Sequence, residues 1–213
     1  MNLLESDENA TFEIEMESTE LVVAMVKPNN LPSSGTTTLT ISGAGFGVTN
    51  TVILSNASDS CRLQSVATDN NGNLVATVDC EKLLAGATYS LTVESNGKNA
   101  TLDNAVTVSG AVGKGEIEAK LVFPNTAREG RVYVGYVEYS NIGNADMPAP
   151  VFVVSSDSNG LLVGSSDDSS KMSSKVHLIG IGSAAPVGIL RAGDSMRVPF
   201  YFVINNIATY GFK

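Results

Sequence analysis

The chain has 213 residues, of which 43% are hydrophobic and 16% are charged, and its formal net charge is -9. This composition supplies enough apolar material for packed cores, and the length allows one large or two ordinary domains. The negative charge opposes binding to polyanions, so nucleic acid is not an expected partner. No run of about 18 apolar residues occurs, so direct membrane insertion of a helix is not expected either.

The first segment, residues 1–18, lacks a basic start followed by an apolar stretch, so it does not have the pattern of a secretion signal. Between residues 11 and 17, Phe12, Ile14 and Met16 alternate with acidic residues. This is the period-two pattern of a half-buried strand. We interpret the segment as an added edge strand or the end of a preceding module. Both ends of the chain look cut from something longer, so neighbouring modules or subunits of the same protein are expected partners.

Short runs with strand character follow between residues 19 and 110. They begin at Leu21, Thr37, Thr51, Cys61, Asn73, Ala87 and Ala105. Turn residues separate them, and DNNGN at residues 69–73 is suited to a hairpin turn. In the run from Ala87, we expect Tyr89, Leu91 and Val93 to share a buried face. Short β-branched strands at this spacing are typical of a Greek-key sandwich.

Two stretches of this region carry a family resemblance. VKPNNLPSSGTTTLTISGAGFG has a Pro turn followed by a Gly-x-Gly-Phe corner, and LLAGATYSLTVESNGKNATLDNAVTVSG has a Gly-x-x-Tyr strand. Together they resemble the IPT/TIG immunoglobulin-like domain, over about residues 19–110. Such domains occur in cell-surface receptors, in bacterial surface proteins, beside catalytic domains of carbohydrate-active enzymes and in some transcription factors. The resemblance implies an immunoglobulin-like fold and leaves function open.

The glycine-rich segment at Gly43 to Gly47 of that corner sits between strands. We interpret it as a β-corner, because no helix follows whose N-terminus would hold a phosphate.

A second domain is predicted over residues 111–213, and its strands follow the linker-like GAVGKG at residues 110–115. Its strand candidates are EIEAKLVF, RVYVGYVEYSN, APVFVVSS, LLVG, SKVHLIGI and SMRVPFYFVI. Both faces of the run from Arg131 are largely apolar, which indicates a central strand. VEYSNIGNADMPAPVFVVSS, followed by LRAGDSMRVPFYFV, resembles bacterial cell-adhesion-related and other surface immunoglobulin-like modules, in which a strand ending in Asn-x-Gly turns back. The predicted fold class is all-β, with two tandem immunoglobulin-like β-sandwich domains.

The two cysteines, Cys61 and Cys80, fall in or at the end of predicted strands that the hairpin at residues 69–73 would join. They could therefore face each other, and we predict a disulfide. The loop that it would close contributes roughly 3 kcal/mol in the chain-entropy model. The alternative is two buried free thiols in a cytosolic protein.

Asn-x-Ser/Thr triplets occur at Asn9, Asn56 and Asn99. They permit glycosylation in a secreted protein, although such triplets also arise by chance in a chain rich in Asn, Ser and Thr.

No catalytic constellation stands out. The single histidine, His177, lies in an alternating run, and we expect packing or surface exposure rather than a catalytic or metal role. No Gly-x-Ser-x-Gly elbow is present. No cofactor is expected, with calcium kept open, and the low-affinity candidates are Asp69, Asn71, Asn73, Asp167 and Asp168, with Asp157 and Asn159 beside them. A plain hairpin and solvated loops are the alternative for these residues.

Two functions are compatible with these patterns. The first is a non-catalytic structural or adhesive module of a larger extracellular or cell-surface protein, such as a repeat unit of a filament or appendage. The alternative is a carbohydrate-binding or accessory module of a multidomain secreted enzyme, with surface glycans as partners. Such a module needs exposed flat aromatics, but Trp is absent, and core packing explains the strand tyrosines more simply. Those tyrosines are Tyr133, Tyr136, Tyr139 and Tyr201.

Overall fold

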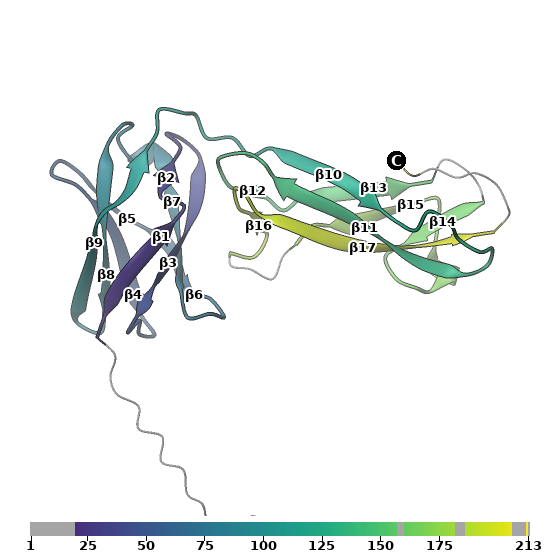
Figure 1. Cartoon of the computed structure of the whole chain (residues 1–213), viewed down its shortest axis with the longest axis horizontal. Helices are drawn as coiled ribbons and strands as arrows, with labels where there is room; N and C mark the ends of the chain where they lie inside the picture. The colour runs from purple at the N-terminus through teal and green to yellow at the C-terminus, as the bar shows by residue number, and fades with distance from the viewer. Residues whose placement is uncertain (1–19, 157–159, 182–185, 206–211, 213) are drawn as a thin grey trace, which may run out of the picture.

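The computed structural model describes residues 20–156, 160–181, 186–205 and 212. Nearly all of the regular structure is β (Figure 1), which confirms the predicted all-β class. The predictions for residues 11–17, Asn9, Asp157 and Asn159 lie outside the described residues.

The first sandwich contains nine of the described strands. They are β1 (Val22–Lys27), β2 (Asn30–Leu31), β3 (Thr36–Ala44), β4 (Asn50–Ser55), β5 (Ser60–Arg62), β6 (Gln64–Thr68), β7 (Leu74–Asp79), β8 (Thr88–Ser95) and β9 (Lys98–Val108). One sheet has the order β1-β3-β7-β6 and the other the order β2-β9-β8-β4-β5. Neighbouring strands such as β3 and β7 are distant in sequence, as in a Greek-key sandwich.

The core of the first sandwich follows from alternation along its strands. Tyr89, Leu91 and Val93 of β8 are fully buried, as predicted, and they pack with Leu39 and Ile41 of β3. At full burial, each aliphatic side chain of this kind contributes about 1.5–3 kcal/mol. The two inner faces therefore hold the sandwich together.

The run from Cys61, expected as one strand, is divided between the two sheets. It forms β5 in one sheet and β6 in the other. Leu63 between them is buried, and Ser65 has a positive φ of 51°. The pairing of β6 with β7 also shifts register between Gln64 and Ala67. The chain crosses between sheets here, which a period-two pattern does not reveal.

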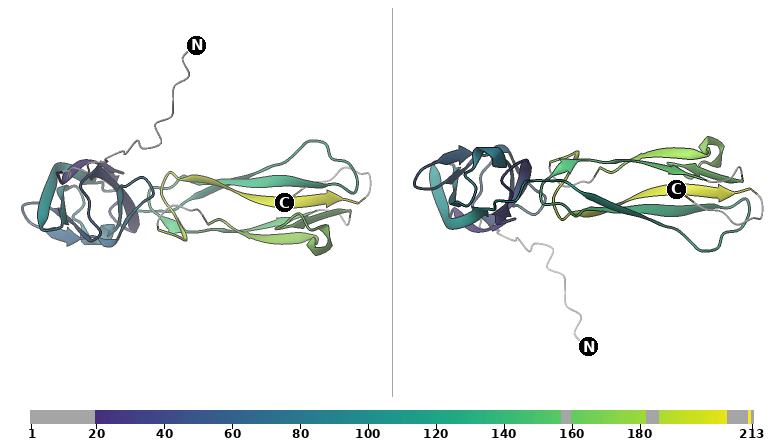
Figure 2. Two further views of the ribbon diagram at one scale, coloured as in Figure 1. Left: turned by 90° about the horizontal axis from the view of Figure 1, so that it is seen from below. Right: turned by 90° about the horizontal axis from the view of Figure 1, so that it is seen from above.

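The second sandwich is built from the later strands. They are β10 (Ile117–Val122), β11 (Val132–Asn141), β12 (Met147–Pro148), β13 (Val151–Ser155), β14 (Leu161–Gly164), β15 (Lys175–Ile179), β16 (Ile189–Leu190) and β17 (Ser195–Ile204). A four-stranded sheet of order β10-β11-β17-β14 faces the pair β13–β15, and Figure 2 shows the two layers. A short β12–β16 pair lies at the end near the first sandwich (Figure 1). Strand β11 pairs on both edges, so its predicted central place is confirmed.

The second core is aromatic-rich and separate from the first. Phe200 and Phe202 of β17 are buried, and the Phe212 ring contacts both, with centroids 5.4 and 5.2 Å away. Gly135 on β11 leaves room for Phe200, whose ring would lie 2.5 Å from an added Cβ. No helix within the described ranges is long and apolar enough to cross a membrane.

Candidate functional site

A polar network joins the two sandwiches and is the first candidate site. The linker between β9 and β10, residues 109–116, runs beside the loop that follows β2. The carbonyl oxygen of Ala111 accepts bonds from the N–H and the hydroxyl of Ser33, at 2.8 and 3.0 Å. The Ser34 hydroxyl accepts a bond from the N–H of Gly113 at 2.9 Å. The linker is therefore bonded to the first sandwich before it enters the second.

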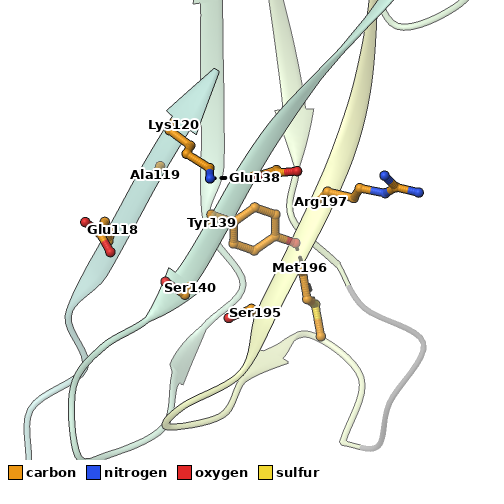
Figure 3. Close-up of a pocket in the computed structure, with 9 residues that line it drawn as sticks. All are labelled: Glu118, Ala119, Lys120, Glu138, Tyr139, Ser140, Ser195, Met196 and Arg197. Carbon is orange, nitrogen blue, oxygen red and sulfur yellow. Dashed lines mark hydrogen bonds and ion pairs between the residues drawn. The ribbon is translucent and has the colours of Figure 1, made fainter. Parts of the chain in front are cut away.

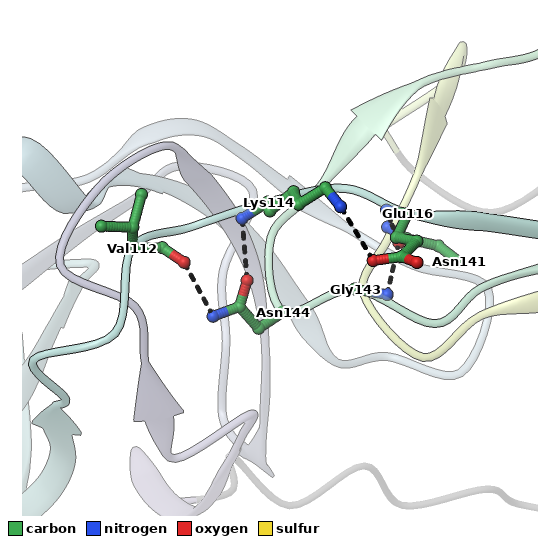
Figure 4. Close-up of polar contacts among 6 residues, drawn as sticks. All are labelled: Val112, Lys114, Glu116, Asn141, Gly143 and Asn144. Atoms are coloured by element: carbon green, nitrogen blue, oxygen red, sulfur yellow. Dashed lines mark hydrogen bonds and ion pairs between the residues drawn. The ribbon is translucent and has the colours of Figure 1, made fainter.

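The turn after β11 bonds the same linker to the second sandwich (Figure 4). The side chain of Asn144 accepts from the N–H of Lys114 at 2.8 Å and donates to the carbonyl of Val112 at 3.2 Å. The Lys114 ammonium forms an ion pair with Glu116 at 3.0 Å. These groups are exposed, so we expect each contact to contribute less than about 1 kcal/mol. They orient the linker more than they stabilise it.

Asn141, the last residue of β11, is fully buried and uses all of its hydrogen-bonding capacity. Its Oδ1 accepts from the N–H groups of Glu116 and Gly143, both at 3.0 Å, as Figure 4 shows. Its Nδ2 donates to the carbonyls of Ala145 and Leu190, at 2.8 and 3.1 Å. A buried amide with every group satisfied fixes the segments that it bonds. This is the Asn of the predicted Asn-x-Gly turn.

Two residues of the second sandwich reach β3 of the first directly. The hydroxyl of Thr38 donates to the Asp146 carboxylate at 2.5 Å, and the N–H of Asp146 donates to the carbonyl of Thr36 at 2.9 Å. The Arg191 guanidinium donates to the hydroxyl of Thr40 at 3.0 Å. Both residues act on the same strand, so together they define the orientation of one sandwich on the other.

The Asp146 carboxyl borders a cavity of about 440 Å³ lined by residues of both sandwiches. Burial raises the pKa of Asp146, against the opposing effects of the hydrogen bonds from Thr38 and from the Ala192 N–H and of the Arg191 charge. The N–H of Ala192 lies 3.2 Å from the carboxylate. Because Thr38 belongs to the first sandwich, the protonation of Asp146 is coupled to docking of the two sandwiches.

Glycines permit the close approach of backbones at this junction. A Cβ at Gly113 would run into the carbonyl oxygen of Ser34, and one at Gly143 into the carbonyl oxygen of Lys114. Glycine is therefore needed at both positions, because the linker contacts the loop after β2 on one side and the turn after β11 on the other.

The outer face of the four-stranded sheet is a second candidate site. A cavity of about 510 Å³ lies across β10, β11 and β17 (Figure 3). Lys120 and Glu138 form an ion pair across it at 3.1 Å, and the Arg197 guanidinium lies 4.7 Å from the centroid of the Tyr136 ring. This arrangement offers polar and cationic groups beside one aromatic ring.

The four strand tyrosines divide between the two faces of this sheet. Tyr139 is buried in the second core, and Tyr133 stacks on Phe202 with ring centroids 5.7 Å apart. Tyr136 and Tyr201 alternate with buried residues and lie partly exposed on the outer face. The four therefore do not form a single flat platform.

Cys61 lies on β5 and Cys80 in the short 3-10 turn η1 (Cys80–Lys82), and both are free, buried thiols of the first core. The hairpin at residues 69–73 joins β6 and β7, so it does not connect the strands of the two cysteines as expected. Burial raises the pKa of both thiols, and the nearby Cys61 adds to the rise at Cys80. The disulfide stays a prediction.

The carboxylate of Asp69, in the first calcium candidate, is bonded to the backbone of its own hairpin. The Asp69 carboxylate accepts from the N–H groups of Asn71 and Asn73 at 2.8 and 2.9 Å, and from Nδ2 of Asn73 at 3.1 Å. Burial tends to raise the pKa of Asp69, but these bonds outweigh it, so the pKa is lowered. Gly72 completes the turn with a φ of 80°, which confirms the predicted hairpin.

The second calcium candidate behaves as a helix cap. Asp168 caps the 3-10 turn η2 (Ser169–Lys171) by accepting from the N–H and the hydroxyl of Ser170, at 3.1 and 2.6 Å. These bonds and the contact with Lys171 lower the pKa of Asp168. Asp167 is exposed. Within the described ranges, no group of three or more His, Cys, Asp or Glu side chains is placed to hold a metal ion.

The remaining sequence candidates lie apart from these sites. His177 is exposed on β15, opposite Val153 of β13. Asn99 is exposed on β9. Asn56, after β4, uses its Oδ1 to accept two backbone hydrogen bonds within its own turn, both at 2.9 Å.

The junction residues Asp146, Arg191 and Thr38 were missed by the sequence reasoning. The bonded pairs are separated by 108 and 151 positions in the sequence, and Thr38 lies in a strand rich in threonine that gives no sign of a partner. Only the glycine-rich linker and the Asn-x-Gly turn gave any signal near this site.

Comparison with known protein families finds a match to part of this chain. The model of the IPT/TIG domain matches residues 21–109, which contain the nine strands of the first sandwich. A search of curated proteins finds no match to the chain.

Proposed function

We propose that this chain, which carries an IPT/TIG domain, is a non-catalytic structural or adhesive module of a larger extracellular or cell-surface protein, repeated along a filament or appendage. The observation that carries the proposal is the junction. Asp146 and Arg191 bond to β3, and the linker is bonded on both sides, so the second sandwich is held in one orientation.

A fixed junction suits a spacer. Two sandwiches joined by a flexible linker adopt many relative orientations, whereas docked sandwiches present their surfaces at a defined spacing and direction. Buried polar contacts add to that definition because their geometry is directional. Asn141 supplies four hydrogen bonds, two of them buried, at the point where the linker enters the second sandwich.

The compartment is tested with protein isolated from its own source. Intact mass and non-reducing peptide mapping report on Cys61, Cys80 and the three Asn-x-Ser/Thr triplets. A Cys61–Cys80 bridge or a glycan at Asn56 or Asn99 supports an oxidising, extracellular compartment. Free thiols together with bare asparagines would overturn it and indicate an intracellular partner-binding module.

Glycan binding is the second candidate, and the outer face of the four-stranded sheet favours it. Tyr136 carries Arg197 over its ring, beside the ion pair of Lys120 and Glu138. A glycan array tests this with Tyr136→Ala as the variant and Tyr201→Ala as its neighbour on the same face. An array without hits removes the candidate, and hits that survive Tyr136→Ala place binding elsewhere.

A further inference from the structure

The outer face of the four-stranded sheet is ordered in rows that cross β10, β11 and β17. Residues that pair directly across the strands form a row, and every second residue along a strand faces outward. The cavity of about 510 Å³ lies over two polar rows, whose side chains Figure 3 shows. The first row is Glu118, Ser140 and Ser195, and the second is Lys120, Glu138 and Arg197. The outer face therefore offers charged groups and hydroxyls together in one hollow.

Arg197 is a cation of this face whose donors are not used by a carboxylate. Glu138, its neighbour across the strands, forms its ion pair with Lys120 at 3.1 Å, and the Arg197 side chain extends away from that pair (Figure 3). The contact that Arg197 does make is with the Tyr136 ring, whose centroid lies 4.7 Å from the guanidinium. Stacking holds the guanidinium in place and leaves the N–H donors at its rim exposed. Arg197 is thus placed to bind a carboxylate through two parallel hydrogen bonds.

The other groups of the two polar rows suit hydroxyls better than further negative charge. Glu118 and Glu138 line the cavity with carboxylate oxygens, which only accept hydrogen bonds, and Ser140 and Ser195 add hydroxyls, which donate and accept. Sugar hydroxyls can pair with both kinds of group. A densely charged ligand such as a polyphosphate would be repelled by the two carboxylates. The cavity therefore fits a ligand with many hydroxyls and few negative charges.

The charge of the chain is distributed so that such a ligand can approach. Residues 111–213 contain nine Lys and Arg and nine Asp and Glu, so this half of the chain is formally neutral. The net charge of -9 therefore lies entirely in residues 1–110. The acidic field that opposes anions comes from the first half of the chain, and a carboxylate at Arg197 meets the neutral half.

An apolar row lies beside the second polar row. Tyr136 pairs with Val122 on one side and with Pro199 on the other. Val122 is 40% exposed, and Pro199 is exposed as well. The C–H face of a sugar ring packs on an apolar surface of this kind. Because Arg197 lies over Tyr136, a ring that rests on this row places a carboxyl group at its rim beside the guanidinium.

We propose that the outer face of the second sandwich binds a uronic-acid polysaccharide, a glycan whose sugar rings carry carboxyl groups. Arg197 binds the carboxylate, and Tyr136 positions Arg197. Glu118, Ser140 and Ser195 bind the hydroxyls of the same chain. This inference rests on the glycan-binding candidate above, and it specifies the class of glycan and the residue that selects it.

Two matched trisaccharides test the class of glycan. Trigalacturonic acid has a carboxylate on every ring, and its methyl ester has the same rings and the same ring hydroxyls without the charge. In calorimetric titrations of the whole chain, the ester should bind at least about tenfold more weakly than the acid, the ratio expected when one charge-assisted pair is lost. Equal binding would overturn the role of the carboxylate and leave glycan binding in place, whereas no binding of either sugar would overturn both. A poly-glutamate peptide that binds as tightly as the acid would indicate an acidic protein partner and overturn the proposal.

Variants of the cation locate the site. Arg197→Gln should weaken binding of trigalacturonic acid at least about tenfold, and Arg197→Lys, which keeps the charge and loses the fork of donors, should lie between this variant and the wild type. Arg131→Gln is the matched control, because Arg131 is exposed and lies 5.9 Å from the Tyr133 ring but does not line the cavity. Arg197 is also exposed, so all three variants should unfold at the wild-type temperature. Binding that survives Arg197→Gln, or that falls equally in Arg131→Gln, would overturn the site. Neither result bears on compartment, which the peptide mapping decides separately.

Discussion

Replacing Asn141 with Ala removes four hydrogen bonds at once, of which two are buried and two are part-buried. A typical intramolecular hydrogen bond contributes about 0.5–1.5 kcal/mol net. The four bonds of the Asn141 side chain, at 2.8 to 3.1 Å, therefore amount to about 4 kcal/mol. Asn141 is completely buried, so water does not readily replace the lost partners. We expect the free energy of unfolding to fall by about that amount.

Asn144→Ala is the matched control. Asn144 lies three positions away and also bonds the linker, at 2.8 and 3.2 Å, but these bonds are exposed and water replaces them. We expect a loss of less than about 1 kcal/mol. Urea unfolding followed by far-ultraviolet circular dichroism measures both variants. If Asn141→Ala costs no more than Asn144→Ala, then burial does not determine the strength of this network.

Further predictions concern the junction and the two cores. Asp146→Ala should lower the free energy of unfolding, measured in urea, by about 2 kcal/mol. Asp194→Ala, which removes a carboxylate that lines the same cavity, should lower it by at most about 0.5 kcal/mol. Equal losses would mean that the effect comes from removing a negative charge and not from the hydrogen bonds of Asp146. Burial raises the pKa of Asp146 above its unfolded value near 3.9, so its contribution to the free energy of unfolding is complete below about pH 4 and is lost as pH rises through the folded pKa. Urea unfolding at a series of pH values should therefore show a different pH dependence for wild type and for Asp146→Asn. Parallel curves for the two proteins would refute this coupling. Gly135→Ala would bring a Cβ to 2.5 Å from the Phe200 ring and should cost about 1–3 kcal/mol in thermal unfolding, unless the ring moves freely. Tyr89→Phe removes the hydroxyl that accepts a backbone N–H at 2.8 Å and should cost about 1–2 kcal/mol in the same assay, an unchanged midpoint meaning that solvent satisfies that N–H.

Much of the strand pattern could be predicted because alternation and turn residues are local signals. The buried face of β8 and the hairpin at residues 69–73 follow directly from them. The central place of β11 follows from its two apolar faces.

The switch from β5 to β6 could not be predicted, because a crossing between sheets leaves the alternation almost unchanged. It moved Cys61 away from the sheet of β7 and altered the expected relation to Cys80. Asp69 and Asp168 looked like ion ligands in sequence, but their carboxylates are used by the adjacent backbone. The contacts between the two sandwiches could not be predicted for another reason. Their partners meet only after both sandwiches have folded.

The junction also determines how the molecule would respond to tension. A pull on the two ends meets the bonds of Asp146 and Arg191 to β3 first, because the linker beside them is itself bonded on both sides. These bonds lie close together and would break nearly together. Their rupture, followed by that of the exposed bonds that hold the linker to Ser34 and Asn144, would free residues 110–115 as a short reserve of length while both cores stay folded. The two sandwiches would thus absorb a first extension as a reversible hinge.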